Sequence, residues 1–364
     1  MDTPAVSAPP PKPGLFERAR AHLFYGPAAG LVTFTIAALL LWALWRSFGW
    51  GVLHAVAAPD FAACKAADHG ACWGFVAEKW RLILFGRYPY EQQWRPALAT
   101  GAVLAMLVAS ALPAFWTRRG ARALAGGWLI AFAVFFTLMR GGVLGLESVG
   151  TERWGGLPLT VILTLIGITA SAPVGVLLAL ARRSSMGLLR SLAVAYIELV
   201  RGVPLITVLF VATFVFPLVL PAGWRIDPFW RVVIGIVLFQ AAYMAETVRG
   251  GLQSIPKAQH EAALSLGLRY WQVQASVILP QALVAVIPAF VNNLLSTFMD
   301  TSLVTVVSMY DLTGALRLAL GDPVWRQFFI EGYLFIAAIY FGASFVMSRY
   351  SLWLERRLRI GNAQ

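Results

Sequence analysis

Glu198 and Arg201 are the charged residues that stand most clearly inside an apolar stretch, in the segment Tyr196–Pro204. A charge surrounded by lipid is costly, so such residues usually face protein or water and pair. A spacing of three residues puts both on one helix face, within pairing reach. Two interpretations stay open: a polar element of a translocation path or gate, or an ion pair that holds this helix to a neighbour.

The segment 245–281 contains a second pattern with a physical meaning. Pro256 suits the first turn of a helix, Lys257–Leu266 are good helix formers, and Gly267 can end the helix in the left-handed conformation. The sequence therefore predicts a helix of two to three turns in a loop between two apolar stretches.

Much of this short helix has small side chains, so it could sit deep in a groove of another protein. Apolar anchors would come from five neighbouring residues: Leu264, Leu266, Leu268, Tyr270 and Trp271. The alternative is a solvated amphipathic loop that lies on the lipid. That alternative explains the helix, but not why Glu261-Ala262-Ala263 and Gly267 are followed by Val277-x-Leu279-Pro280 at the next apolar stretch.

Side chains that would carry catalysis are sparse. The four histidines lie outside the apolar stretches, and no cluster of His, Cys and acidic residues has metal-ligand spacing. The phosphate-binding pattern G-x-x-x-x-G-K-[ST] is absent, and no nucleophile–base pair stands out. We expect no catalytic residue, no metal and no cofactor in this chain.

The composition sets the environment in which these residues work. Hydrophobic residues make up 59% of the 364 residues and charged residues only 13%, whereas a soluble domain has about 25% charged residues. A soluble enzyme and a disordered chain are both excluded on this ground. The net charge of the chain is +12. Membrane proteins collect Lys and Arg at the cytoplasmic ends of their helices, which accounts for this excess, so we expect no nucleic-acid partner.

Crossing the hydrocarbon core takes roughly 20 apolar residues. The sequence predicts an all-α integral membrane protein with eight such spans, and Pro204 and Pro217 in the fifth favour a break there. The spans are Ala28–Trp45, Pro96–Trp116, Leu124–Met139, Leu157–Ala181, Leu192–Leu220, Phe229–Arg249, Leu279–Phe298 and Phe328–Ser348.

Lysine and arginine collect on one side of these spans, in both terminal segments and in the loops that contain Arg118, Arg182 and Lys257. By the positive-inside rule that side is cytoplasmic, so both termini are predicted to be cytoplasmic.

The largest loop on the other side of the membrane contains Cys64 and Cys72. These two cysteines could form a disulfide in an oxidising compartment. The alternative is two unpaired thiols.

The pattern Glu261-Ala262-Ala263-x3-Gly267-x9-Val277-x-Leu279-Pro280 resembles the cytoplasmic coupling signature of ATP-binding-cassette (ABC) importer permeases, with Val277 where Ile is usual. Further motifs resemble the polar-amino-acid branch of that family. They are Tyr196-x-Glu198-x2-Arg201-Gly202-x-Pro204, Tyr243-x2-Glu246-x2-Arg249-Gly250-Gly251, Ser254-Ile255-Pro256 and Asp300-Thr301-Ser302-Leu303. The three earlier spans resemble the longer permease subunits of broad-specificity L-amino-acid importers.

The resemblance implies a type I importer permease core of five helices with a three-helix N-terminal extension, in a bacterial inner membrane. The divisions are a disordered cytoplasmic tail (1–26), the extension (27–150) with an extracytoplasmic loop (48–95), the core (151–350), the coupling loop (245–281) and a second cytoplasmic tail (351–364). The expected ATPase-coupling residues are Glu261, Ala262, Ala263, Leu264, Gly267 and Leu268.

The partners that the resemblance implies are a second permease subunit, which makes a heterodimer, a periplasmic amino-acid-binding protein, and two cytoplasmic ATPase subunits. ATP and Mg would be used by the ATPase, not by this chain. The candidate residues for the path or for helix packing are Glu198, Arg201, Glu246, Arg249, Asn292, Asn293, Asp300, Thr301 and Ser302.

Three departures from the family pattern remove polar groups. Val203 and Val208 stand where the branch commonly has Thr and Gln, and Met299 stands where Lys is common. They leave open whether this subunit or its partner permease contacts the substrate.

The predicted function is the permease subunit of an ATP-driven amino-acid importer, a transport subunit and not an enzyme. The alternatives are a secondary transporter driven by an ion gradient and a membrane scaffold that transports nothing.

Overall fold

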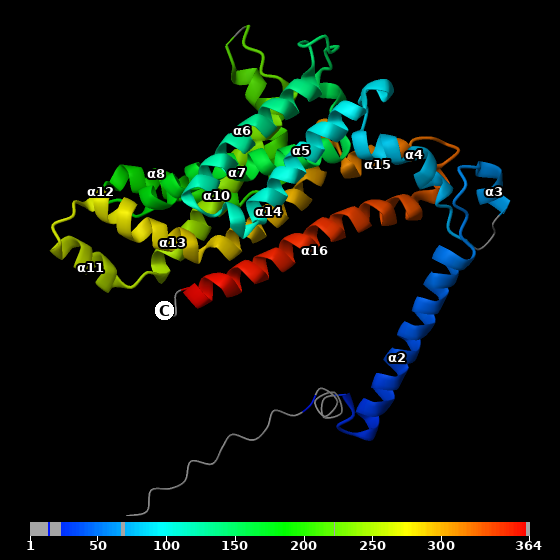
Figure 1. Cartoon of the computed structure of the whole chain (residues 1–364), viewed down its shortest axis with the longest axis horizontal. Coiled ribbons are helices and arrows are strands. Elements are labelled where there is room, and N and C mark those ends of the chain that lie inside the picture. The colour runs from blue at the N-terminus through cyan, green and yellow to red at the C-terminus, as the bar shows by residue number, and fades with distance from the viewer. Residues whose placement is uncertain (1–13, 15–22, 67–69, 222, 362–364) are drawn as a thin grey trace, which may run out of the picture. The chain divides into compact units, whose positions relative to one another are not determined.

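The structure is a computed structural model that describes residues 14, 23–66, 70–221 and 223–361 (Figure 1). Most of the predicted N-terminal tail, and residues 362–364 of the predicted C-terminal tail, lie outside the described residues. The chain divides into two compact units, Met1–Ala77 and Glu78–Gln364.

The first unit contains one long apolar helix and a small stapled loop. Helix α2 (Pro27–Phe48) continues through a π-helical turn (Gly49–Leu53), and none of its side chains is buried within the chain. That pattern suits a helix whose surroundings are lipid or another chain. A short helix, α3 (Phe61–Ala66), follows.

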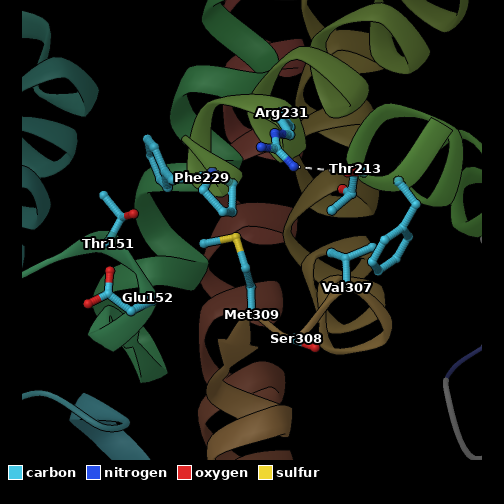
Figure 2. A pocket seen from close by; sticks show the side chains of 10 residues that line it. Thr151, Glu152, Thr213, Phe229, Arg231, Val307, Ser308 and Met309 are labelled. Atoms are coloured by element: carbon cyan, nitrogen blue, oxygen red, sulfur yellow. Dashed lines mark hydrogen bonds between the residues drawn. The ribbon is translucent and has the colours of Figure 1, made fainter. Parts of the chain in front are cut away.

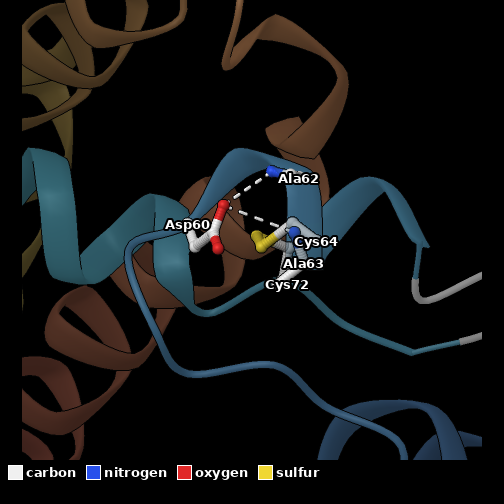
Figure 3. Close-up of a disulfide and its surroundings, with 5 residues drawn as sticks. All are labelled: Asp60, Ala62, Ala63, Cys64 and Cys72. Carbon is white, nitrogen blue, oxygen red and sulfur yellow. Dashed lines mark hydrogen bonds between the residues drawn. A yellow bond between two sulfur atoms is a disulfide. The ribbon is translucent and has the colours of Figure 1, made fainter.

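Cys64 and Cys72 form a disulfide, with their Cα atoms 5.4 Å apart (Figure 3). Both residues are buried, and a β-bridge joins Val56 to Cys72. The Asp60 carboxylate accepts a hydrogen bond from the backbone N–H of Ala62 (2.8 Å), which caps the start of α3.

The disulfide leads to a thiol-counting prediction. We expect the unfolded, unreduced protein to show no reactive thiol, and to show two after reduction, because Cys64 and Cys72 are the protein's two cysteines. A Cys64→Ser variant serves as the control and should show one thiol without reduction. Two reactive thiols in the unreduced wild-type protein would contradict the pairing.

The remaining elements are mostly helices. They are α4 (Gly74–Phe85), α5 (Trp94–Ala111), α6 (Arg118–Arg140), α7 (Gly156–Arg182), α8 (Gly187–Arg201), α9 (Leu205–Phe210), α10 (Pro228–Ser254), α11 (Lys257–Ser265), α12 (Tyr270–Gln272), α13 (Leu279–Ala285), α14 (Ile287–Asp300), β1 (Tyr310–Asp311), α15 (Leu312–Ala319) and α16 (Phe329–Gly361). The shorter turns are 3-10 turns at Tyr90–Gln92, Pro113–Phe115, Thr151–Arg153, Phe216–Val219, Thr301–Val307 and Arg326–Phe328, and π-helical turns at Val211–Val215 and Val273–Ile278.

Within the described residues, six helices are long and apolar enough to cross a membrane, and two bent pairs would bring the number to eight. One pair, Gly187–Arg201 with Leu205–Val219, is bent by 105°, and the predicted break at Pro204 lies between its two parts. The other pair, Tyr270–Ala285 with Ile287–Val307, is bent by 58°, a break that the sequence analysis did not predict. The all-α membrane fold is thus confirmed.

The last helix is longer than predicted. Helix α16 runs to Gly361, so residues 351–361, which were expected to form a tail, continue the helix. Nothing in this segment breaks a helix, since it is rich in Leu and Arg and its first glycine is Gly361.

Helices α7 and α10 pack along one another at the centre of the second unit. Two glycines on α7 make the close approach possible. A Cβ atom at Gly167 would lie 2.6 Å from Ile236 of α10, and one at Gly175 would lie 2.6 Å from Met244. This pair is the frame on which the candidate residues of α8 and α11 are placed.

Arg95 of α5 and Tyr88, just before α5, fix the end of α6. The buried Arg95 guanidinium donates from Nε to the Leu138 carbonyl (2.6 Å) and from Nη1 to the Glu147 carbonyl (2.9 Å). The Tyr88 hydroxyl donates to the Met139 carbonyl (3.0 Å), and burial raises the pKa of Tyr88 to about 12. A cation at a helix C-terminus is favourable because that end carries partial negative charge.

An aromatic cluster joins α6 to the core. Phe136 stacks on Trp230 with ring centroids 5.8 Å apart and lies 6.0 Å from the ring of Trp154. The Trp154 ring is in turn 5.3 Å from that of Phe229. These rings bury large apolar surfaces against one another, so the α5–α6 hairpin is an integral part of the second unit.

Candidate functional site

Helix α11 is the predicted short helix, with both ends set by local chemistry. Pro256 precedes its first residue, and Gly267 has a φ of +77°, a conformation that L side chains rarely adopt. The Gly267 N–H donates to the Leu264 carbonyl (2.9 Å), and the Leu268 N–H donates to the Ala263 carbonyl (3.3 Å). These two bonds form the Schellman motif that ends helices at glycine.

The residues of α11 divide between an exposed face and one contact with the rest of the chain. Glu261, Ala262 and Leu264 are exposed. Ala263 is only 4% exposed and packs in a buried cluster with Val273 of the following π-helical turn. Ala263 therefore packs the helix on its own chain, and its role in ATPase coupling stays a prediction.

Four apolar side chains near the end of α11 and in α12 are exposed to an unusual degree. They are Leu264 (48%), Leu266 (81%), Tyr270 (46%) and Trp271 (68%). Contiguous exposed apolar surface marks a site of contact with protein or membrane. Leu268, predicted to join them, is half-buried against the core cluster that contains Ala263.

Glu246 of α10 is the centre of a charged network that joins three helices. Its carboxylate lies 2.5 Å from Arg182 Nη1 at the end of α7 and 2.7 Å from Arg249 Nη2, one turn along α10. Arg201 Nη1 of α8 lies 3.9 Å from it. Glu198 of α8 accepts from Arg182 Nη2 at 3.0 Å.

The two charges in α8 thus pair with residues of α7 and α10, as expected for ion pairs that hold this helix to its neighbours; a role in the path or gate is untested. The Glu246 side chain is 15% exposed and that of Glu198 is 58% exposed. Glu246 therefore joins α10 to the C-terminal ends of α7 and α8, and Glu198 lies at the margin of the network. Arg182 belongs to the network but was counted only as a loop charge in the sequence analysis.

The candidate polar residues in and just after the predicted seventh span have different surroundings. Asn293 of α14 donates from Nδ2 to the Thr247 hydroxyl of α10 (3.0 Å), which is an interhelical hydrogen bond, whereas Asn292 is exposed. Thr301 is buried and donates to the Phe298 carbonyl (2.8 Å), and Asp300 and Ser302 beside it are half-buried.

Asp311 is a buried acid that the sequence analysis missed. Its Oδ1 accepts from the Gly314 N–H (2.9 Å) and from the Thr305 hydroxyl (3.2 Å), and its Oδ2 accepts from the Tyr340 hydroxyl (3.0 Å). Burial raises the pKa of Asp311, and these hydrogen bonds act against that rise. An Asp three residues before Gly314, at the start of α15, is the sequence signal of an N-cap that could have identified it.

The part of the chain that the structure describes contains no group of three or more His, Cys, Asp or Glu residues that could hold a metal ion. The candidate site instead has two parts: an exposed helix with an apolar end, α11, and a charged network that ties α7, α8 and α10.

Similarity to known proteins shows the family of this chain. Residues 171–360 match the family described as "Binding-protein-dependent transport system inner membrane component". The chain is 42% identical to the inner membrane amino-acid ABC transporter permease protein YhdY of Escherichia coli (strain K12), over 99% of both chains. It is 35% identical to the glutamate/glutamine/aspartate/asparagine transport system permease protein BztC of Rhodobacter capsulatus, over 97% of this chain and 96% of that one.

A solved structure, that of an amino acid ABC transporter with histidines, has a similar fold. The matched region covers 56% of this chain and 92% of the solved chain, with a TM-score of 0.50 and 31% sequence identity. The family predicted from the motifs is therefore confirmed. The chain belongs to the binding-protein-dependent transport system inner membrane components, as a multi-pass subunit of the inner membrane.

Proposed function

We propose that this chain is the permease subunit of an ATP-driven amino-acid importer. It is a transport subunit and not an enzyme, and a separate ATPase subunit hydrolyses the ATP. It forms the translocation path together with a partner permease. The observation that carries this proposal is α11, which presents Glu261, Ala262 and Leu264 outward and ends at Gly267.

The exposed end of α11 supports docking to another protein more than contact with lipid alone. A helix lying on lipid needs a continuous apolar face, whereas α11 exposes Glu261 and Lys257 beside its small residues. The apolar cluster is confined to the helix end and α12. A docked ATPase that moves α11 would also move the two parts of the chain that hold it: the π-helical turn Val273–Ile278, against which Ala263 packs, and the end of α10.

The full assembly that we propose contains a second, different permease, two ATPase copies that use ATP and Mg, and a periplasmic amino-acid-binding protein. Both termini of this chain are cytoplasmic, as the distribution of Lys and Arg favours. The names of the relatives YhdY and BztC support amino acids as the cargo.

The experiment is purification of the tagged chain with its partners, followed by uptake into liposomes. We expect a second permease and an ATPase to copurify, and labelled L-amino acids to enter only with ATP and a binding protein present. Uptake that persists without ATP under an ion gradient would favour a secondary transporter. A complex that moves no solute under any condition would favour a scaffold.

Two matched variants, in which neighbouring alanines are each replaced by aspartate, test the docking face. Ala262→Asp places a charge on the exposed face, and we expect the ATPase to be lost on copurification while the permease keeps its folded yield. Ala263→Asp buries a charge in the chain's own core, so we expect loss of folded permease itself. Equal ATPase recovery from Ala262→Asp and wild type would reject the docking face.

A further inference from the structure

Two segments that are far apart in the chain meet through aromatic rings at one end of the second unit. The Trp116 ring, just after the 3-10 turn that follows α5, lies 5.8 Å from the Trp353 ring of α16. Trp353 also stacks on Tyr350, with ring centroids 5.7 Å apart. The Arg357 guanidinium lies 5.1 Å from the centroid of the Trp116 ring and 5.4 Å from that of Trp353, so it contacts both segments.

The length of α16 places these rings at a membrane surface. Its 33 residues extend for about 50 Å, whereas the hydrocarbon core is about 30 Å thick. The predicted span ends at Ser348, so Tyr350 and Trp353 follow directly after it. The turn between the candidate spans α5 and α6, where Trp116 lies, also belongs at a membrane surface. Trp and Tyr are enriched at this level, where an amphipathic ring meets both lipid and water.

The same two segments, 116–122 and 349–357, carry a large excess of positive charge. Their one acidic residue is Glu355, and they contain six exposed arginines: Arg118, Arg119, Arg122, Arg349, Arg356 and Arg357. No ion pair joins any of the six to an acid among the described residues. Arg118 and Arg119 also lie in the first turn of α6, which has no acidic residue, and cations are unfavourable at a helix N-terminus.

Arginines that serve the fold of this unit have fixed partners instead. Arg231 donates from Nε to the Ile226 carbonyl (2.7 Å) and from Nη1 to the Thr213 carbonyl (3.1 Å), and Figure 2 shows the second of these bonds. Arg249 pairs with Glu246 at 2.7 Å. The six exposed arginines therefore form a surface whose positive charge is left for a partner outside the described chain.

We propose that this surface binds the head group of an anionic phospholipid from the cytoplasmic leaflet. Arg357 donates to the phosphate, the Trp116 and Trp353 rings lie at the level of the head group, and the other five arginines add attraction. The cytoplasmic side rests on the orientation given under the proposed function. Charge complementarity favours this occupant, because each basic group near an anionic membrane surface strengthens binding about fivefold. The lipid would join the end of α16 to the α5–α6 hairpin of the N-terminal extension.

The test measures binding of a fluorescent short-chain phosphatidylglycerol to the detergent-purified permease–ATPase complex. Phosphatidylcholine with the same label is the comparison without net charge. We expect wild type to bind the anionic probe more tightly, and Arg357→Gln to weaken that binding about fivefold, the effect of one basic group. Arg357→Lys keeps the charge and should stay close to wild type. Equal binding of the two lipids by wild type would overturn the proposal.

Arg225→Gln is the matched control for a lost charge. Arg225 is exposed in the segment before α10 and lies outside the two segments, so its loss should leave the binding unchanged. Equal weakening by Arg225→Gln and Arg357→Gln would mean a general attraction and would reject the assigned surface. If Arg357→Gln has a lowered thermal midpoint, the double variant Arg118→Gln with Arg119→Gln decides instead: it should weaken binding, and unchanged binding would count against the proposal.

Two further outcomes identify other occupants. Excess glycerol 3-phosphate should not displace the probe, and displacement would mean a soluble phosphate ligand in place of a lipid. Loss of the ATPase from Arg357→Gln on copurification, with lipid binding unchanged, would assign the surface to the ATPase and overturn the proposal. A complex that binds the anionic lipid as expected but imports no amino acid contradicts the proposed function and leaves this inference standing.

Discussion

A Gly267→Val variant is expected to lose ATP-coupled uptake while the membrane helices stay folded. At a φ of +77°, a side chain with a Cβ costs roughly 1–2 kcal/mol, and a β-branched residue is among the worst suited. The chain can relieve this strain by abandoning the hydrogen bonds of Gly267 and Leu268 to the last turn of α11. The end of α11 then moves, together with the exposed Leu264 and Leu266.

Uptake and ATP hydrolysis in liposomes measure the effect. A loss of about 1.4 kcal/mol from the free energy of docking lowers the equilibrium constant for the docked arrangement about tenfold. We therefore expect uptake to fall roughly tenfold or more. ATP hydrolysis should no longer respond to the loaded binding protein. Wild-type transport and hydrolysis by Gly267→Val would refute the assignment of α11 as the coupling helix.

Gly267→Asn is the matched control. Asn tolerates the left-handed conformation better than other residues with side chains. No atom lies within 4 Å of a Cβ built at Gly267, so neither substitution meets a steric clash, and the two differ in backbone strain. Gly267→Asn should therefore keep most of the uptake that Gly267→Val loses.

The sequence was most informative where the determinants are local. Pro256 and Gly267 define α11 through their own backbone preferences, and Pro204 marks the break in the fifth span in the same way. The long apolar stretches identify the spans because their length alone meets the thickness of a bilayer. Such features need no knowledge of the neighbours in space.

What the sequence could not reveal depends on contacts between distant segments. The burial of Ala263 depends on Val273 packing against it, and the partnership of Arg182 with Glu246 joins residues 64 apart. Spacing along one helix suggested Glu198 with Arg201, but a nearer partner from another helix was available to each.

Glu246→Gln is expected to destabilise the permease. The amide keeps the size of the side chain but removes the charge that faces Arg182, Arg249 and, at 3.9 Å, Arg201. Arg249 and Arg201 lose the acid that they share, and Arg182 keeps only Glu198. Removing one partner of a fully buried ion pair costs about 3–5 kcal/mol. We expect a smaller cost here, about 1–3 kcal/mol, because the arginine side chains are partly exposed and one of them keeps an acidic partner. Folded domains are stable by only about 5–15 kcal/mol, so we expect a fall in monodisperse protein and a lower thermal midpoint.

Glu91→Gln is the control for a lost carboxylate, since Glu91 lies exposed on the turn Tyr90–Gln92. It should change stability by no more than about 0.5 kcal/mol. Similar midpoints for Glu246→Gln and Glu91→Gln would mean that the network does not hold the helices together.

A double variant, Glu246→Gln with Arg249→Gln, distinguishes a structural network from a gate. Removing one positive charge along with the negative one restores part of the charge balance, so the midpoint should recover relative to Glu246→Gln alone. If the network only joins α7, α8 and α10, uptake should recover in step with the folded fraction. Uptake that stays low in a well-folded double variant would show that the pairing of Glu246 with Arg249 takes part in the transport cycle, because stability would no longer account for the loss.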